Sequence, residues 1–348
     1  MLTLSQATAK SRTILKIGIV VLSLIFLVLI LFRIGIILQE KFFPKAPAPP
    51  TVSFGKIPQI VFPSNVTDKS YNYSLDTVTG ELPAFPDRVR VYKMTTDLPD
   101  LLALQKAKSK VAAVGFTSTE LPISTKTYQW NDPEHLDKTL TMNISSLNFN
   151  LTSSFMSDSV VQSAVNLPSP TAAITTAQGF LSAMSNFPDD IDLSKTKTLL
   201  FSINNNTLAS ATSFSNTQVI EVDFFQKEVD KLPIFYPKAV NTTMNILIVG
   251  GKNQPQVAQV NYFHQNISSE NATYPIKTAQ DAFSLLKQGQ GYIASYFGSS
   301  TDISIKNVYL AYYMSDKKQD YLEPIAVFEG DNGFFAYVPV ITDVWVSK

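Results

Sequence analysis

Few residues in this chain have the types and spacing that catalysis requires. The 348 residues include two histidines, His135 and His264, and no cysteine. The absence of cysteine excludes thiol catalysis, Cys-ligated zinc and iron–sulfur clusters. The members of a Ser-His-Asp site need not be adjacent in sequence, but no Gly-x-Ser-x-Gly motif marks a nucleophile. We therefore interpret both imidazoles as surface side chains and expect no catalytic residue.

Two further segments have compositions that suit a bound ion or cofactor. Asp189-Asp190-Ile191-Asp192 is the densest acidic cluster and offers oxygen ligands for Ca²⁺, but it lacks the spacing, glycine and final Glu of an EF-hand. We favour a solvated turn whose carboxylates cap a helix. Gly250-Gly251 follows a strand-like run without a later glycine, which favours a hairpin turn over dinucleotide binding. The sequence predicts no metal ion and no cofactor.

Aromatic residues are better candidates for recognition than for reaction. One tract surrounds the charged segment Asp316–Asp320, and another lies between Pro233 and Pro237. Tyrosine supplies both apolar area and a hydroxyl at an interface, although either tract also suits a core. The residues proposed as an interaction surface are Tyr309, Tyr313, Tyr321, Phe235 and Tyr236.

The elements that would position these residues follow a repeating order, in which a helix is followed by about three strands. Leu98–Val114 has helical apolar spacing, with Asp97 placed to cap it. Asn204-Asn205-Asn206 and Asp331-Asn332-Gly333 are typical of hairpin turns. Residues 308–313 predict a strand with apolar or aromatic side chains on both faces. We expect one face to pack on a helix and the other on a neighbouring unit. This pattern predicts an α+β fold of tandem helix-plus-antiparallel-sheet units that share a continuous core.

Ile14–Leu38 is almost unbroken Ile, Leu, Val and Phe and predicts a single membrane-spanning helix. Lys10, Arg12 and Lys16 lie at its start with no acidic residue nearby, so the N-terminus is expected in the cytoplasm and the body outside the membrane. Cleavage as a secretory signal is the alternative, which the length of the apolar run disfavours.

Composition favours an extracytoplasmic body and a bacterial source. The 28 basic and 28 acidic residues cancel, so no nucleic-acid partner is expected. A eukaryotic secreted ectodomain of this size without cysteine would be unusual. The predicted parts are a cytoplasmic tail (1–13), a transmembrane helix (14–38), a proline-rich stalk with edge strands (39–80), α+β unit 1 (81–165), unit 2 (166–238), and a hairpin plus unit 3 (239–348).

The last 75 or so residues carry a resemblance. Tyr274-Pro275-Ile276, the predicted helix Ala279–Leu286 with Gly289 after it, Val308–Tyr313 and Tyr321–Phe328 resemble YycH/YycI-type bacterial envelope regulators and, more loosely, PepSY-like modules. The resemblance implies a short cytoplasmic start, one membrane helix and extracytoplasmic helix-plus-sheet units. It also implies a non-enzymatic role, in which members of that family adjust a membrane sensor kinase.

The leading functional hypothesis is therefore a membrane-anchored, non-catalytic protein that binds another envelope protein or a cell-wall component. Two alternatives come from other classes. One is an anchored envelope hydrolase with a site built from scattered Ser, Asp and His. The other is a structural subunit of an envelope complex, although Ile14–Leu38 lacks the early acidic residue of a pilin helix.

Overall fold

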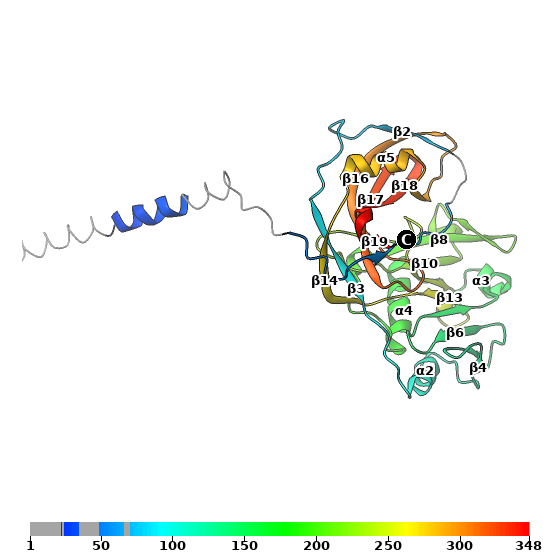
Figure 1. Cartoon of the computed structure of the whole chain (residues 1–348). Helices are drawn as coiled ribbons and strands as arrows, with labels where there is room; N and C mark the ends of the chain where they lie inside the picture. Colours follow the sequence, from blue (N-terminus) through cyan, green and yellow to red (C-terminus); the bar gives the residue numbers. More distant parts are fainter. Residues whose placement is uncertain (1–21, 23, 35–48, 66–69, 348) are drawn as a thin grey trace, which may run out of the picture. The chain divides into compact units, whose positions relative to one another are not determined.

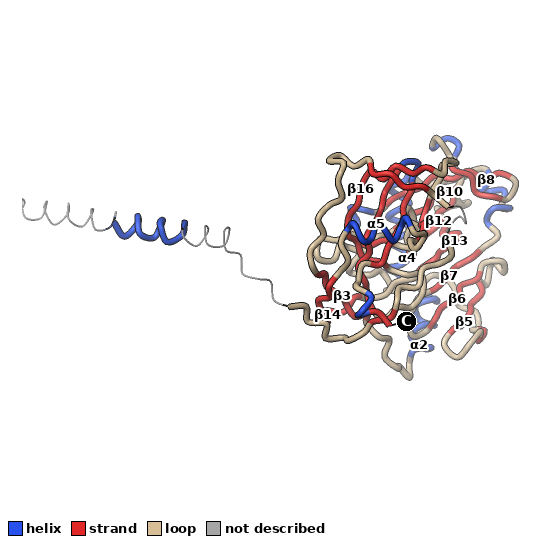
Figure 2. The backbone as a smooth tube through the Cα atoms, turned by 45° about the horizontal axis from the view of Figure 1, so that its top comes forward, coloured by secondary structure: helices blue, strands red, loops and turns tan. Residues whose placement is uncertain are grey.

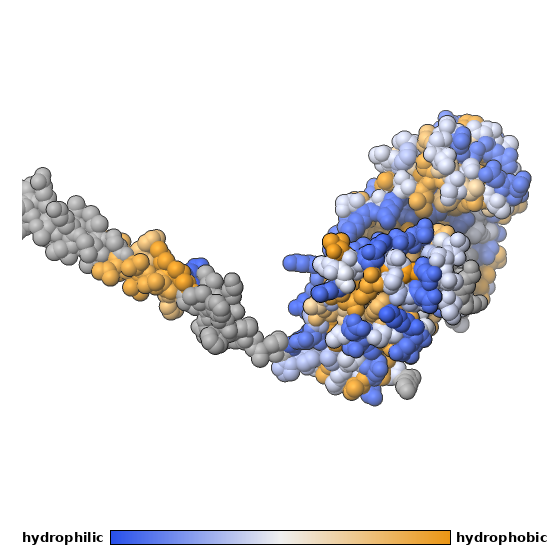
Figure 3. Space-filling view, turned by 90° about the horizontal axis from the view of Figure 1, so that it is seen from above, coloured by the Kyte–Doolittle hydropathy of each residue, from blue (hydrophilic) through white to orange (hydrophobic). Residues whose placement is uncertain are grey.

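The structure is a computed structural model that describes residues 22, 24–34, 49–65 and 70–347. The chain divides into two compact units, Met1–Pro49 and Pro50–Lys348. In the first unit, described residues 22 and 24–34 are helical and, apart from Arg33, hydrophobic, and large side chains such as Leu29 are exposed (Figure 3). No helix within the described ranges is both long and apolar enough to cross a membrane. Most of the predicted span Ile14–Leu38, and all of the predicted cytoplasmic tail, lie outside the described residues.

The second unit contains a nine-stranded antiparallel sheet, whose strands lie side by side in Figure 2. Their order is β4 (Leu121–Pro122), β5 (Thr127–Asn131), β6 (Thr139–Asn143), β7 (Phe149–Thr152), β13 (Gln256–Tyr262), β12 (Met244–Val249), β10 (Val219–Asp223), β8 (Lys197–Asn204) and β9 (Thr207–Ser210).

One face of this sheet is covered by helices. The helices α2 (Ala103–Ala112) and α4 (Pro170–Ala183) contribute buried apolar residues to the same core cluster as the sheet. Helix α4 begins at Pro170 because the Ser169 side chain accepts a hydrogen bond from the Ala172 N–H and proline suits the first helical position. Ala173 and Ala177 face the sheet, and their small side chains allow the helix to approach it closely.

The second sheet is built mainly from the C-terminal part of the chain. Its path is β11 (Ile234–Phe235), β16 (Asp302–Tyr313), β17 (Tyr321–Gly330), β18 (Phe334–Pro339) and β15 (Tyr292–Ser295), joined by β2 (Asn72–Leu75), β3 (Arg88–Met94) and β14 (Ile267–Pro275). Helix α5 (Ala279–Lys287) lies over β16–β18 (Figure 1) and starts with a capping box between Thr278 and Asp281. As predicted, Val308, Leu310 and Tyr312 pack with this helix in one core, and the alternate residues Tyr309, Ala311 and Tyr313 belong to another cluster.

Short elements complete the second unit. They are β1 (Ile57–Pro58), which pairs in parallel with β19 (Val346–Ser347), α3 (Ser159–Gln162), and the 3₁₀ turns η1 (Phe155–Ser157), η2 (Leu193–Lys195), η3 (Phe214–Asn216), η4 (Asp331–Gly333) and η5 (Asp343–Trp345).

The fold is α+β and mostly sheet, but the strands combine differently from the predicted order of units. Strands of segments 81–165 and 166–238 share the nine-stranded sheet, and the predicted hairpin β12–β13 lies in its interior instead of between two units. The boundaries predicted at 165/166 and 238/239 therefore do not separate the sheets. The physical reason is that β7 pairs with β13, which follows it by about a hundred residues, so local spacing alone cannot reveal the partner.

Candidate functional site

Three cavities adjoin the loop between β16 and β17, residues 314–320. We call them the end cavity (about 450 Å³), the strap cavity (about 400 Å³) and the face cavity (about 490 Å³). Lys318 lines the end and strap cavities, and Asp316 lines the strap and face cavities. This loop contains the charged segment Asp316–Asp320, which one of the predicted aromatic tracts surrounds.

Gln319 fixes the loop. Its Nε2 donates to the carbonyl oxygens of Tyr313 (3.1 Å) and Tyr321 (3.0 Å), closing the hairpin. Its backbone N–H donates to Gln265 Oε1 at 3.0 Å, and Gln265 Nε2 donates back to the Gln319 carbonyl at 3.1 Å. Because Gln265 follows β13, this exchange ties the C-terminal hairpin to the end of the nine-stranded sheet. The walls of the cavities are therefore held together by hydrogen bonds before any ligand arrives.

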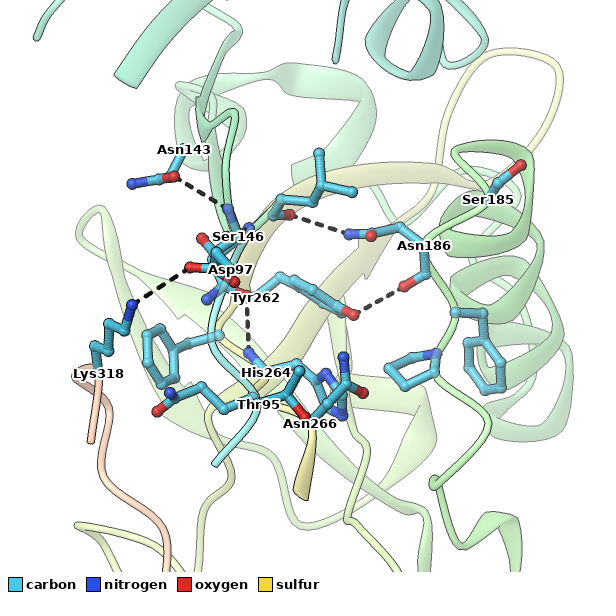
Figure 4. Close-up of a pocket in the computed structure, with 16 residues that line it drawn as sticks. Thr95, Asp97, Asn143, Ser146, Ser185, Asn186, Tyr262, His264, Asn266 and Lys318 are labelled. Atoms are coloured by element: carbon cyan, nitrogen blue, oxygen red, sulfur yellow. Dashed lines mark hydrogen bonds and ion pairs between the residues drawn. The ribbon is translucent and has the colours of Figure 1, made fainter. Parts of the chain in front are cut away.

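The end cavity is rich in uncharged amides (Figure 4). The Tyr262 hydroxyl donates to the Asn186 carbonyl at 2.8 Å, and Asn186 Nδ2 donates to the Leu147 carbonyl at 3.1 Å. The His264 backbone N–H donates to Asn148 Oδ1 at 2.9 Å. The amide side chains that line the cavity are Asn143, Asn148, Asn186, Gln265 and Asn266. Each amide both donates and accepts, which suits a ligand with hydroxyl or amide groups.

Asp97 lies in this cavity, which corrects its predicted role. The observed helix α2 begins at Ala103, its N-cap position is Leu102, and no side chain caps it. The Asp97 carboxylate instead pairs with Lys318 Nζ at 3.7 Å, in a partly exposed ion pair (Figure 4). The start of the predicted helix fails because Leu98, Leu101 and Leu102 are exposed and so gain nothing from packing as a helix.

His264 is not a surface side chain, contrary to the prediction. Its side chain is 7% exposed, and Nε2 lies 2.8 Å from Asp190 Oδ1. Gln226 Nε2 donates to Asp190 Oδ2 at 2.8 Å. Burial by itself would raise the pKa of the Asp190 carboxyl, but the hydrogen bonds and the charge interaction from His264 and Gln226 lower it overall. This cluster fastens the segment after α4 to the end of β13.

Asp192 and His135, which the sequence also singled out, are not part of the His264–Asp190 cluster. Asp192 caps the turn η2 by accepting from the Ser194 N–H at 3.0 Å, as predicted for a capping carboxylate. His135 is exposed in the loop between β5 and β6. No serine or threonine hydroxyl among the described residues hydrogen-bonds the ring of His264. Within the same residues, no group of three His, Asp or Glu side chains is arranged to hold a metal ion.

The face cavity lies on the face of the nine-stranded sheet opposite α2 and α4, where α3 and η1 cover a different part of the sheet. Here residues in register across six neighbouring strands are all polar, although the intervening positions are buried and mostly apolar. We call this set the amide row: Asp223 (β10), Asn245 (β12), Asn261 (β13), Asn150 (β7), Thr141 (β6) and Gln129 (β5). The row extends roughly 24 Å, since neighbouring strands lie ~4.8 Å apart.

The middle of the amide row is accessible. Asn150 and Asn261 are exposed, and Asn245 is half-buried. Asn261 Nδ2 donates to Asn245 Oδ1 at 2.9 Å, which orients both amides. Four members of the row line the face cavity, which is bounded on its other side by residues of segment 236–243 and by Asp316. An extended chain of neutral polar groups fits this surface better than a compact or charged ligand does.

One end of the amide row is a carboxyl pair. Asp223 is fully buried beside Glu221, and desolvation followed by the neighbouring Glu221 charge raises the Asp223 pKa to about 8. With both groups ionised, neither can donate, and neither Asp223 oxygen has a hydrogen-bond partner among the described residues. A proton shared between the two carboxyl groups supplies the missing hydrogen bond. The raised pKa favours the protonated form of Asp223.

The predicted aromatic surface is largely internal. Tyr313 and Tyr236 are 2% and 3% exposed, so their rings stabilise the core and cannot form an open surface. Phe235 and Tyr309 are half-buried and pack against each other with ring centres 6.0 Å apart. The same residues still border cavities, since Tyr313 and Tyr321 line the strap cavity and Tyr236 lines the face cavity.

The asparagines of the amide row were missed by sequence reasoning. Asn150, Asn245 and Asn261 fall in runs that the sequence predicts as strands, but nothing in those runs shows that the three side chains lie in register. The alternation of polar and apolar residues could have indicated a polar face. Each of these asparagines lies two residues from another polar residue, and the residue between them is apolar.

Comparisons with known proteins return weak structural similarities. No protein-family model matches the chain, and no curated protein matches its sequence. Among solved structures, an uncharacterized protein from Eubacterium rectale matches with a TM-score of 0.39 and 12% identity, covering 79% of this chain and 90% of that one. The Bacillus megaterium YpeB C-terminal domain matches with a TM-score of 0.31 and 11% identity, covering 71% of this chain and 95% of that one. Both TM-scores lie below 0.5, a range in which similarity does not establish a shared fold.

Proposed function

We propose that residues 50–347 form a non-enzymatic binding module that recognises a neutral, hydroxyl-rich and amide-rich polymer of the bacterial cell wall, namely its glycan. The observation that carries this proposal is the amide row, a polar line across six strands on the face opposite α2 and α4, four members of which line an accessible cavity. Every sugar hydroxyl needs both a donor and an acceptor, and side-chain amides supply both at one position.

The absence of charge on the exposed part of the amide row favours a neutral ligand over a charged one. The chain carries no net charge, and the exposed members of the amide row are uncharged. A phosphate-rich polymer such as nucleic acid would favour clustered Lys and Arg, which the amide row does not have. The length of the row exceeds that of a single sugar, which favours a polymer.

The binding module is proposed to be held at the outer surface of the membrane by Ile14–Leu38, with 1–13 in the cytoplasm and 39–80 as a stalk. The apolar run and its flanking positive charges support this topology. The resemblance of segments 274–289, 308–313 and 321–328 to YycH/YycI-type and PepSY-like proteins supports an envelope regulator that reports on its ligand to a membrane partner.

The topology has a direct test. Protease added to intact spheroplasts is expected to remove the body, because residues 50–348 are exposed outside. An epitope tag at residue 1 should survive until the membrane is permeabilised. Protection of the body in sealed spheroplasts would contradict the topology.

Glycan binding is tested with the full-length chain in detergent and purified, insoluble cell-wall sacculi. The double substitution Asn150→Ala and Asn261→Ala is expected to weaken co-sedimentation roughly tenfold or more, since each lost hydrogen bond contributes ~1 kcal/mol. Asn271→Ala is the matched control, because Asn271 is an exposed strand asparagine on β14, outside the amide row.

Two results would contradict the proposal. One is equal sedimentation of the double variant and the unaltered chain. The other is an equal loss in Asn271→Ala. Unchanged melting temperatures for all three chains would show that the loss reflects recognition and not unfolding.

A further inference from the structure

The strap cavity contains a buried carboxyl group that nothing in the fold explains. Glu323 on β17 is 7% exposed, and no side chain among the described residues donates a hydrogen bond or pairs with its carboxylate. An ionised carboxylate taken out of water without a partner is strongly destabilising. The folded chain therefore gains nothing from a charge at this position, and a ligand that supplies the missing positive charge would give the carboxylate a partner.

A second polar group in the same cavity also lacks a partner. Tyr313 on β16 is the register partner of Glu323, so the two side chains lie on the same face of the sheet. The Tyr313 hydroxyl is buried, and although the Ser315 side chain lies near enough to favour its ionised form, no hydrogen bond of normal geometry reaches it from the described residues. Among the described residues, the cavity therefore has a carboxyl group and a hydroxyl group without hydrogen-bond partners, carried by side chains at paired positions of neighbouring strands.

Three aromatic side chains line the cavity, those of Phe62, Tyr313 and Tyr321. Phe62, in the covering strap of residues 58–63, meets the Tyr313 ring edge-on with centres 4.8 Å apart and stacks on Tyr292 at 5.0 Å. Aromatic faces attract organic cations through their negative π-surfaces. A carboxylate at the base of such a wall is the usual chemistry for binding an ammonium group.

We propose that the strap cavity is a binding site for an organic ammonium group at the end of an alkyl chain, held by the Glu323 carboxylate and the Tyr313 hydroxyl. The cavity volume of about 400 Å³ accommodates an aminoalkyl chain. The inference goes beyond the proposed glycan recognition, since the residues involved are not members of the amide row.

Proton release follows from this arrangement. Desolvation raises the Glu323 pKa to about 8, so the empty site holds a neutral carboxyl group at pH 7. An entering ammonium group stabilises the ionised form, and one proton leaves for each ligand bound. Below pH 8 the affinity should rise about tenfold for each pH unit.

The other titratable and charged groups near Glu323 are tyrosines and the side chains of the β16–β17 loop. Burial raises the pKa of Tyr313 and of Tyr274, so neither phenol ionises in this pH range. The residues of the strap that line the cavity have no ionisable side chain. The charged groups of the β16–β17 loop that line the cavity are Asp316, Lys317, Lys318 and Asp320, and Lys318 is paired with Asp97.

The test is isothermal titration of the full-length chain with n-butylammonium chloride at pH 6, 7 and 8, in two buffers with different ionisation enthalpies. We expect saturable binding, release of close to one proton at pH 7, and an affinity that falls about tenfold from pH 7 to pH 6. Glu323→Gln should weaken binding at least tenfold and abolish its pH dependence. Tyr313→Phe keeps the ring and should weaken binding while preserving proton release.

Glu329→Gln, at the other end of the same strand, is the matched control and should bind like the unaltered chain. Absence of saturable binding, or equal binding by Glu323→Gln, would overturn the inference. Retention on sacculi is expected to be unaffected by Glu323→Gln, so failure of this inference and failure of glycan binding give different results.

Discussion

Asp223→Asn is expected to stabilise the folded chain at pH 8 by roughly 2–5 kcal/mol and to remove about half of the fall in stability between pH 5 and pH 9, because Glu323, whose pKa is also raised to about 8, contributes a similar fall. Asp223 is fully buried next to Glu221, and its pKa is raised to about 8 by desolvation and then by the Glu221 charge. An amide of the same shape needs no proton and can donate to Glu221 at every pH.

The sign of the effect follows from proton binding. In the unfolded chain Asp223 ionises near its ordinary pKa of ~3.9, but in the folded chain it keeps its proton to about pH 8. The folded state therefore binds more protons between these values, and stability declines as pH rises through this window. The contribution of the protonated pair is complete below pH ~4 and is lost as pH passes 8.

Urea unfolding of the full-length chain at pH 5, 7 and 9 measures this effect. The unaltered chain should lose stability at each step, and Asp223→Asn should lose about half as much, since Glu323 still contributes. Glu270→Gln is the control, because Glu270 is an exposed carboxylate paired loosely with Lys93 at 3.5 Å and should shift stability by less than ~0.5 kcal/mol. An Asp223→Asn profile parallel to that of the unaltered chain would show that Asp223 does not hold its proton.

Gly250→Ala is expected to destabilise the chain by roughly 3 kcal/mol or to prevent folding. A Cβ atom at this position would lie 2.9 Å from the Val165 carbonyl carbon and 3.0 Å from the Leu167 nitrogen, and closer still to the Val165 oxygen. These are backbone atoms, so no side-chain rotation relieves the clash. The change would force the connection between α3 and α4 away from the β12–β13 hairpin.

Gly179→Ala is the matched comparison, and it is expected to raise the stability of the chain instead of lowering it. Gly179 is exposed within α4, and a Cβ atom there meets nothing within 4 Å. Alanine should stabilise the helix by ~1 kcal/mol. Thermal unfolding of both variants tests the pair, and a Gly250→Ala chain as stable as the unaltered one would contradict the close packing of segment 165–167.

Local features of the fold could be predicted because their causes are local. Asn205 and Asn206 have φ values of 49° and 57° in the β8–β9 turn, and Asn332 and Gly333 have φ values of 54° and 66°, as the turn motifs predicted. Gly250-Gly251 forms the predicted hairpin connection. The arrangement of strands could not be predicted, because pairings such as β3 with β14 join residues about 180 positions apart and depend on the complete core.

The candidate site was harder to predict than the fold. Tyr313 and Tyr321 were singled out and line the strap cavity, but Glu323 was not, since a glutamate in a strand gives no sign that it is buried without a partner. The amide row depends on the register of six strands, which no short window of sequence contains. His264 was assigned to the surface because the sequence does not show that Asp190 folds against it.

The central claim is that the amide row contacts cell-wall glycan, and photo-crosslinking in intact cells tests it most directly. The photoreactive residue p-benzoylphenylalanine replaces Thr141, which lies within the row, or Asn271, which lies outside it. The account predicts an adduct only from position 141, whose size collapses when a glycan-cleaving muramidase is added. Equal adducts from both positions, or a position-141 adduct that muramidase leaves unchanged, would contradict it.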